Sequence, residues 1–174
     1  MSRTPTPLGA VVHGAMAGGA GTAAMDLALY LRYRVSSDDQ GFLGWEFGGP
    51  SAWDRISAPG QVGRRLVEGF RQRALDERWA RLTNNVTHWG YGIAWGGVLG
   101  LLAGSTPRSR HAMVGPLFGA TVWGSSYVTL PVAGLYKPIW EYGPGELAPD
   151  LIAHLIFGVT AHRALRWLGG SAGS

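Results

Sequence analysis

Charged residues are nearly absent from two long stretches of this 174-residue chain. Residues 84–133 contain only Arg108 and Arg110 as charged side chains, and residues 12–30 contain only Asp26. Charged residues make up 15% of the whole chain, against about 25% in soluble domains. Long uncharged stretches separated by charged segments are typical of proteins that cross a membrane.

Four segments have the length that spans a bilayer core of about 30 Å at 1.5 Å per helical residue. No stretch alternates strictly between apolar and polar residues, so strands are not expected. The sequence therefore predicts an all-α polytopic membrane protein, a single domain over residues 1–174 that forms a bundle of four transmembrane helices. The predicted spans are residues 8–32, 87–104, 112–132 and 148–168.

The segment between the first two spans, residues 33–86, is predicted to lie outside the membrane. Its first part, residues 36–59, is rich in Gly, Asp, Ser and Trp and is typical of a loop. After it, Val62, Leu66 and Phe70 recur every four residues among arginines. This spacing predicts an amphipathic helix, which either lies on the membrane or caps the bundle.

Two segments of the chain resemble each other. His88 and His154 are each followed by an aromatic residue at the third position and a glycine at the fourth, and each lies early in a predicted span. The other two spans carry GxxxG patterns, at Gly14 and Gly18 and at Gly115 and Gly119, which let helices pack closely. The order glycine helix, histidine helix, repeated once, predicts a two-helix internal repeat.

A histidine or carboxylate in an apolar span is costly unless it is paired, so these residues predict a polar cluster inside the bundle. Two imidazoles and a carboxylate could bind a divalent metal, with His88, His154 and Asp26 as candidate ligands. The two histidines could instead hold a haem, or the cluster could relay protons. Interhelical hydrogen bonding without any ligand is the interpretation we favour, so no cofactor is expected. The predicted cluster comprises Asp26, His88, His154, Asn85, Ser125 and Asp150.

Several classes of protein are not indicated by the sequence. The absence of cysteine excludes disulfides and thiolate metal sites. No basic stripe with stacking aromatics suggests nucleic-acid binding, although the net charge is +4. No nucleophile-elbow or metalloprotease motif is present, so the sequence offers no case for a hydrolase, and a non-enzymatic protein is the expectation. We expect the lipid bilayer as a partner, with a homodimer or a membrane complex as further partners.

Four features of the second half fall within residues 84–166: the span that begins His88-Trp-Gly-Tyr, the helix with Gly115 and Gly119, the connector 130–140 and the segment 146–157. In these features the second half resembles the YagU-like family of bacterial inner-membrane proteins, whose function is unknown. The resemblance implies a multi-pass protein of the bacterial inner membrane, and the basic loops favour cytoplasmic termini. We therefore expect an integral membrane protein with a structural or stress-related role. A small transporter or proton-linked channel component, or a metal- or haem-binding subunit of a membrane complex, are the open alternatives.

Overall fold

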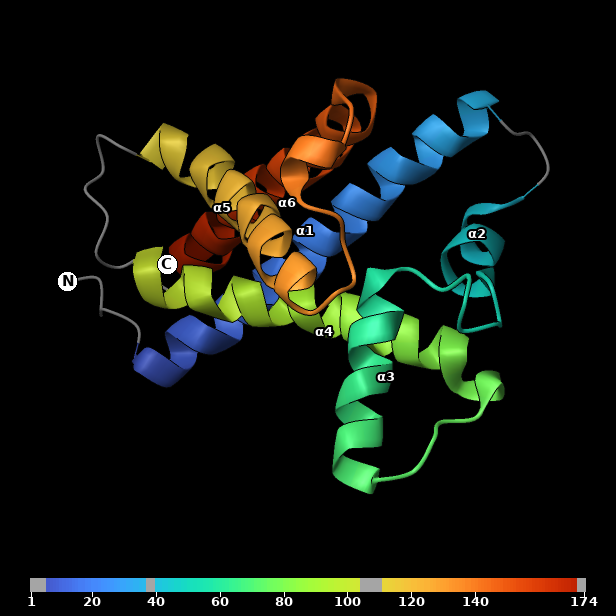
Figure 1. Ribbon diagram of the computed structural model, residues 1–174. Helices are drawn as coiled ribbons and strands as arrows, with labels where there is room; N and C mark the ends of the chain where they lie inside the picture. The colour runs from blue at the N-terminus through green and yellow to red at the C-terminus, as the bar shows by residue number, and fades with distance from the viewer. Residues whose placement is uncertain (1–5, 37–39, 104–110, 172–174) are drawn as a thin grey trace.

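The computed structural model describes residues 6–36, 40–103 and 111–171, and every regular element within them is helical (Figure 1). The prediction of an all-helical chain is thus confirmed for the described residues. The elements are α1 (Pro7–Ser36), α2 (Phe42–Gly48), α3 (Ala58–Arg71), η1 (Glu77–Trp79), α4 (Ala80–Ala103), α5 (His111–Val132), η3 (Ile139–Glu141) and α6 (Pro144–Ser171).

The prediction of four membrane-spanning helices is wrong. Long helices do occur at all four predicted positions, but no helix in the described part of the chain combines the length and the apolarity that crossing a membrane requires. The reason is that a helix without charges is not necessarily apolar. Glycine occupies five positions of α4, and serine, threonine, tryptophan and tyrosine dilute α5, whereas insertion is driven by Leu, Ile, Phe and Val. The predicted location, as a multi-pass protein of the bacterial inner membrane with cytoplasmic termini, is overturned by the same finding.

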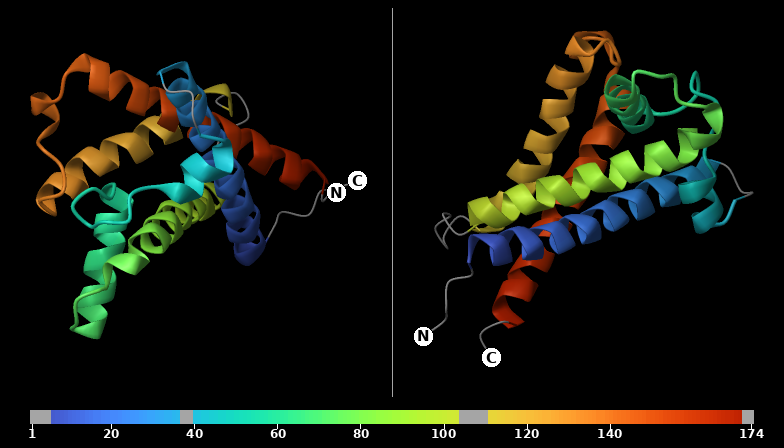
Figure 2. Two further views of the ribbon diagram at one scale, coloured as in Figure 1. Left: turned by 90° about the vertical axis from the view of Figure 1, so that its right-hand side faces the viewer. Right: turned by 90° about the horizontal axis from the view of Figure 1, so that it is seen from below.

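The prediction of a four-helix bundle is also wrong. The long helices do not surround one common axis. Instead, α1 contacts α4 and α6 extensively, and α6 contacts α5. Helix α6 crosses α1 at a steep angle, as the two views in Figure 2 show. Helices α4 and α5 meet through the rings of Trp95 and Phe118, whose centroids lie 5.9 Å apart. Glycine contacts that fix each pair separately account for this arrangement.

Helices α1 and α4 run antiparallel in backbone contact along a ladder of glycines. A Cβ atom added to Gly18 would lie 2.8 Å from the Cα of Gly96, and one added to Gly14 would lie 2.9 Å from the Cα of Gly100. One turn further along, Gly92 faces Thr22, whose hydroxyl donates to the Gly18 carbonyl at 3.0 Å. Any larger side chain would push the two backbones apart, so this sequence specifies a close contact.

Helices α5 and α6 form a second antiparallel pair of the same kind. A Cβ atom on Gly115 would lie 2.9 Å from the Cα of Val159, and one on Gly119 would lie 3.1 Å from the Cα of Leu155. Side chains of α1, α4, α5 and α6 meet in one apolar core that joins the two pairs. Its buried members are Ala17, Met25, Leu99, Phe118, Val122, Ala153, Phe157, Ala161 and Leu165.

The segment before α4 folds onto that helix. The predicted amphipathic helix is α3, which approaches α4 through its buried glycines, Gly60 and Gly63. A small second core forms beneath it from Trp53, Ile56 and Ala80. Residues 36–59, which were predicted to be a loop, contain the short helix α2. Ring contacts of Phe42 and Trp45 with Tyr30 of α1 hold this short helix in place.

The outward faces of the long helices remain apolar. On α1 the exposed large side chains follow each other at helical spacing, and α4 and α5 show similar rows. Patches of this kind usually mark places where a protein meets a partner. The expected homodimer or complex partner stays a prediction. On α1 these residues are Leu8, Val12, Met16, Leu27 and Leu31.

Candidate functional site

A buried carboxylate of α1 faces an imidazole of α4. Asp26 has a side chain only 4% exposed, and both of its oxygens lie close to Nε2 of His88, at 2.9 and 3.1 Å. His88 is 24% exposed. The antiparallel glycine ladder determines this pairing, because each four-residue step toward the end of α1 matches one step toward the start of α4. Gly18 opposite Gly96 thus places Asp26 opposite His88.

Opposing influences act on the proton of His88. Burial is the largest and lowers its pKa, whereas the hydrogen bond to Asp26 and the charges of Asp26 and Glu46 raise it. The net effect is a pKa above the ordinary value, because the two carboxyl groups together outweigh desolvation. His88 therefore carries a proton over a wider pH range than a solvent-exposed histidine.

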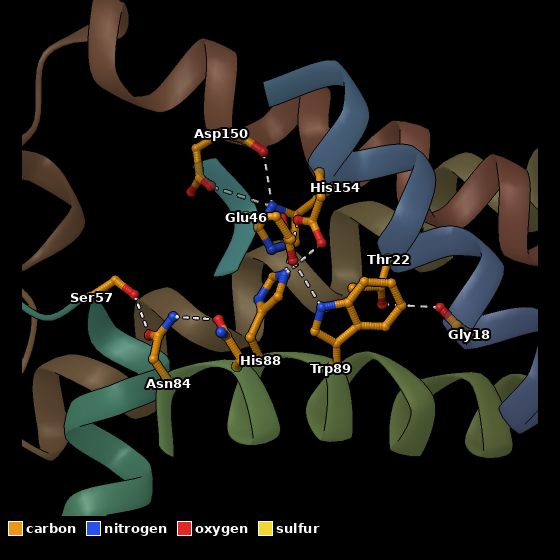
Figure 3. Close-up of polar contacts among 11 residues, drawn as sticks. Gly18, Thr22, Glu46, Ser57, Asn84, His88, Trp89, Asp150 and His154 are labelled. Atoms are coloured by element: carbon orange, nitrogen blue, oxygen red, sulfur yellow. Dashed lines mark hydrogen bonds and ion pairs between the residues drawn. The ribbon is translucent and has the colours of Figure 1, made fainter. Parts of the chain in front are cut away.

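A second carboxyl group reaches the pair from α2. Oε1 of Glu46 accepts a hydrogen bond from the indole Nε1 of Trp89 at 2.9 Å, and Figure 3 shows Glu46, His88 and Trp89 converging. Burial raises the pKa of Glu46 most strongly, the Trp89 hydrogen bond lowers it, and the charge of Asp26 raises it again. The net pKa is raised, so Glu46 retains its proton to higher pH than an exposed glutamate.

Aromatic side chains hold α2 in place. The ring of Tyr30 on α1 lies 5.3 Å from that of Phe42 and 5.6 Å from that of Trp45. Its hydroxyl also donates to the backbone carbonyl of Gln40 at 2.9 Å. A seven-residue helix is too short to be stable alone, so these contacts with α1 are what position Glu46 over the Asp26–His88 pair.

The three titratable groups lie on the wall of a cavity of about 540 Å³ between α1, α2 and the start of α4. Small-molecule sites usually measure about 300–1,000 Å³. Two carboxyl groups and one imidazole contribute, and the described lining residues include neither lysine nor arginine. The lining residues are Asp26, Leu29, Gln40, Trp45, Glu46, Gly48, Gly49, Pro50, Ser57, Asn84, Asn85 and His88.

Amides close one side of this cavity. Oδ1 of Asn84 accepts hydrogen bonds from the Ser57 hydroxyl at 2.6 Å and from the Gly60 backbone at 3.1 Å. Its amide nitrogen donates to Asn85 at 3.4 Å. Asn84 therefore ties the start of α3 to α4, while Asn85 adds a further amide to the cavity wall.

A second polar cluster joins α5 to α6. Oδ2 of Asp150 accepts hydrogen bonds from the indole of Trp123 and the hydroxyl of Tyr127, both at 3.0 Å. Nδ1 of His154 lies 3.4 Å from the other carboxylate oxygen and 2.8 Å from the Asp150 backbone carbonyl. Rings of Tyr127, Tyr136 and Tyr142 pack against one another beside it, with centroids 5.4–6.1 Å apart.

Neighbouring side chains keep the carboxylate of this second cluster ionised. Burial is the largest influence and raises the pKa of Asp150, but the hydrogen bond and charge of His154 and the hydrogen bonds of Tyr127 and Trp123 outweigh it and leave the pKa lowered. The pKa of Tyr127 is raised, first by burial and then by its bond to Asp150. Asp150 thus stays ionised, and Tyr127 stays protonated.

Positions at equal spacing from the glycines and histidines carry different residues in the two halves of the chain. Asp26 follows Gly18 by eight residues, and Tyr127 follows Gly119 by eight. Asn84 precedes His88 by four residues, as Asp150 precedes His154. The carboxylate thus lies on the glycine helix in the first half and on the histidine helix in the second.

The structure divides the polar cluster predicted from the sequence. Asp26 and His88 pair and share the cavity with Asn85, whereas His154 pairs with Asp150. Ser125 donates to the Val122 carbonyl at 2.7 Å. His88, His154 and Asp26, the candidate metal ligands, do not form one group. Within residues 6–36, 40–103 and 111–171, no set of three or more His, Asp or Glu side chains is arranged to hold a metal ion.

The sequence interpretation missed the residues that α2 contributes. Glu46 stands between Trp45 and Phe47 in a glycine-rich segment. An acidic residue flanked by two aromatics in a segment otherwise predicted to be a loop is the signal that could have drawn attention to it. Trp89 is not part of the predicted cluster either, although its indole donates a hydrogen bond to Glu46.

Comparisons with known proteins add no identification. No family model, no curated protein and no solved structure matches this chain. Membership of the YagU-like family stays a prediction from the motifs of the second half.

Proposed function

We propose that this protein binds a small polar molecule in the cavity between α1, α2 and α4, and that it exchanges a proton with the solvent on binding. One observation carries the proposal: Asp26, its partner His88 and Glu46 lie together on the wall of a 540 Å³ cavity. Perturbed titratable groups that line a cavity are characteristic of binding and catalytic sites.

The second cluster supports this assignment by contrast. Asp150 and His154 use the same two residue types, but Oδ2 of Asp150 accepts hydrogen bonds from both Trp123 and Tyr127. Neither residue lines the cavity. We infer that the second cluster stabilises the packing of α5 on α6, which is the structural role expected from the sequence.

Ligand binding changes the protonation of Glu46 and His88 because a charge placed in the cavity shifts the pKa of both groups. A ligand that places positive charge beside Glu46 favours the ionised carboxyl group, and the proton then leaves to water. A ligand that places negative charge there favours protonated His88. In either case the number of bound protons changes when the cavity is filled.

A panel of small ammonium compounds, alcohols, amides and carboxylates tests the proposal. Binding is followed by NMR at the indole N–H groups of Trp45 and Trp89, and proton exchange by calorimetry in two buffers of different ionisation enthalpy. At least one class of compound should shift both indoles and change the number of bound protons. If no compound moves either indole, or if binding moves no proton, the proposal is wrong.

His88→Gln is the informative variant, because glutamine can still donate a hydrogen bond to Asp26 but cannot titrate. It should remove the part of the proton exchange that His88 contributes and leave the fold intact. His13→Gln is the matched control, since His13 lies about 20 Å along α1 from Asp26, at 1.5 Å per residue. That control should bind and exchange protons like the wild type.

A further inference from the structure

We infer that the ligand is a small organic cation, a protonated amine with an apolar portion, and this inference rests on the proposed function. The electrostatics of the wall are the first argument. Asp26 and Glu46 supply two carboxyl groups against one imidazole, and the described lining residues contain no lysine or arginine. With Asp26 already offset by His88, ionised Glu46 leaves the cavity net negative.

The hydrogen-bonding groups of the cavity also suit an ammonium group. An ammonium group donates hydrogen bonds and accepts none, so it needs oxygen acceptors. Oε1 of Glu46 accepts from Trp89, and protonated Glu46 also hydrogen-bonds to Asp26. Once the cation displaces that proton, the ionised Glu46 carboxylate can accept from the ligand instead. Gln40 and Asn85, which also carry amide oxygens, line the same cavity.

Apolar groups of the cavity suit the carbon skeleton of an amine. Leu29 and Pro50 line it together with the indole of Trp45. Contacts with Tyr30 and Phe42 hold that indole in place, at ring distances of 5.6 and 6.4 Å. Tryptophan offers the aromatic face that cations prefer, and a face already fixed by packing loses little entropy when a ligand binds.

The proton balance of binding follows from the two carboxyl groups. At a pH where Glu46 holds its proton, the incoming cation displaces that proton to water, and the carboxylate pairs with the ammonium group. The groups that face Glu46 are Asp26 from α1 and His88 and Trp89 from α4. From α3 the cavity receives no described titratable side chain.

Three probes of matched shape test the inference: benzylammonium, benzyl alcohol and benzoate. They share a benzyl or phenyl skeleton and carry charges of plus one, zero and minus one. Titrations at pH 7.5 should show that benzylammonium binds at least tenfold more tightly than the other two, with shifts at the Trp45 indole. Its affinity should fall as pH is lowered and Glu46 takes up its proton.

Glu46→Gln should weaken benzylammonium binding about tenfold and leave benzyl alcohol unaffected. Glu141→Gln, which removes an exposed carboxylate outside the cavity, is the matched control and should bind like the wild type. Circular dichroism of both variants checks that the fold is retained. Equal binding by the three probes, or preference for benzoate, would overturn the cation inference while the binding function stands. Failure of every compound in the wider panel is the separate result that removes both.

Discussion

Two adjacent glycines of α1 should respond to the same substitution in opposite ways. Alanine at either position gains helix propensity, worth about 1 kcal/mol over glycine. At Gly19 the new Cβ would lie 3.9 Å from a side-chain atom of Ile93, which is ordinary contact. At Gly18 it would lie 2.8 Å from the Cα of Gly96, and a backbone atom cannot rotate away. The structure therefore predicts that Gly19→Ala stabilises the protein and that Gly18→Ala destabilises it.

The magnitudes follow from the contact that each Cβ meets. Overpacking costs about 1–3 kcal/mol, and contact with a backbone puts Gly18→Ala at the upper end. After the propensity gain, Gly18→Ala should lose about 2 kcal/mol of unfolding free energy, whereas Gly19→Ala should gain about 1 kcal/mol. For a chain of this length the two melting temperatures should differ by about 6–12 °C.

Thermal and urea unfolding followed by circular dichroism measure this difference. Gly90→Ala is a further control on the opposite helix, because nothing lies within 4 Å of its added Cβ. It should stabilise the protein by about the amount that Gly19→Ala does. Equal stability of Gly18→Ala and Gly19→Ala would refute the backbone contact between α1 and α4, and with it the pairing of Asp26 and His88.

Three further predictions concern the polar clusters. The pKa of His88 is raised above 6.5, so its contribution to the free energy of unfolding is full below that pH and is lost as pH rises through the folded-state pKa. Urea unfolding from pH 5.5 to 9 should show this fall in the free energy of unfolding, and His88→Gln should make the fall smaller. Tyr127→Phe removes a hydrogen bond to a charged carboxylate and should lower the unfolding free energy by about 1–2 kcal/mol, whereas Tyr136→Phe should lower it by less than about 0.5 kcal/mol. Trp89→Phe removes the donor to Glu46 and should raise the pKa of that carboxyl group in a ¹³C NMR titration; an unchanged pKa would contradict the described contact.

The positions of the long helices could be predicted from the sequence, whereas the prediction that these helices cross a membrane was wrong. Thr6 and Pro7 indicate the start of α1, and the Thr6 hydroxyl accepts from the Gly9 backbone at 3.2 Å. Helix limits depend on such local signals, which a single sequence carries. The membrane prediction failed because it counted missing charges, while the glycines that replace them supply little transfer free energy.

The candidate site was predictable only in part, and for a physical reason. Asp26 and His88 stand out because polar residues in apolar helices need partners. Their actual pairing depends on the register of the α1–α4 glycine ladder, which leaves no local mark in the sequence. Glu46 reaches the pair only because aromatic contacts fold α2 back onto α1. Such a tertiary contact overrides the loop-like composition of its segment.

The most direct test of the binding site is the titration of His88 itself. NMR of the ¹⁵N-labelled imidazole gives its pKa in the free protein and in the protein saturated with benzylammonium. We expect a His88 pKa above the ordinary value in the free protein, and a lower one when the cation occupies the cavity. A His88 pKa at or below the ordinary value, or titration curves that superimpose with and without the ligand, would contradict this expectation.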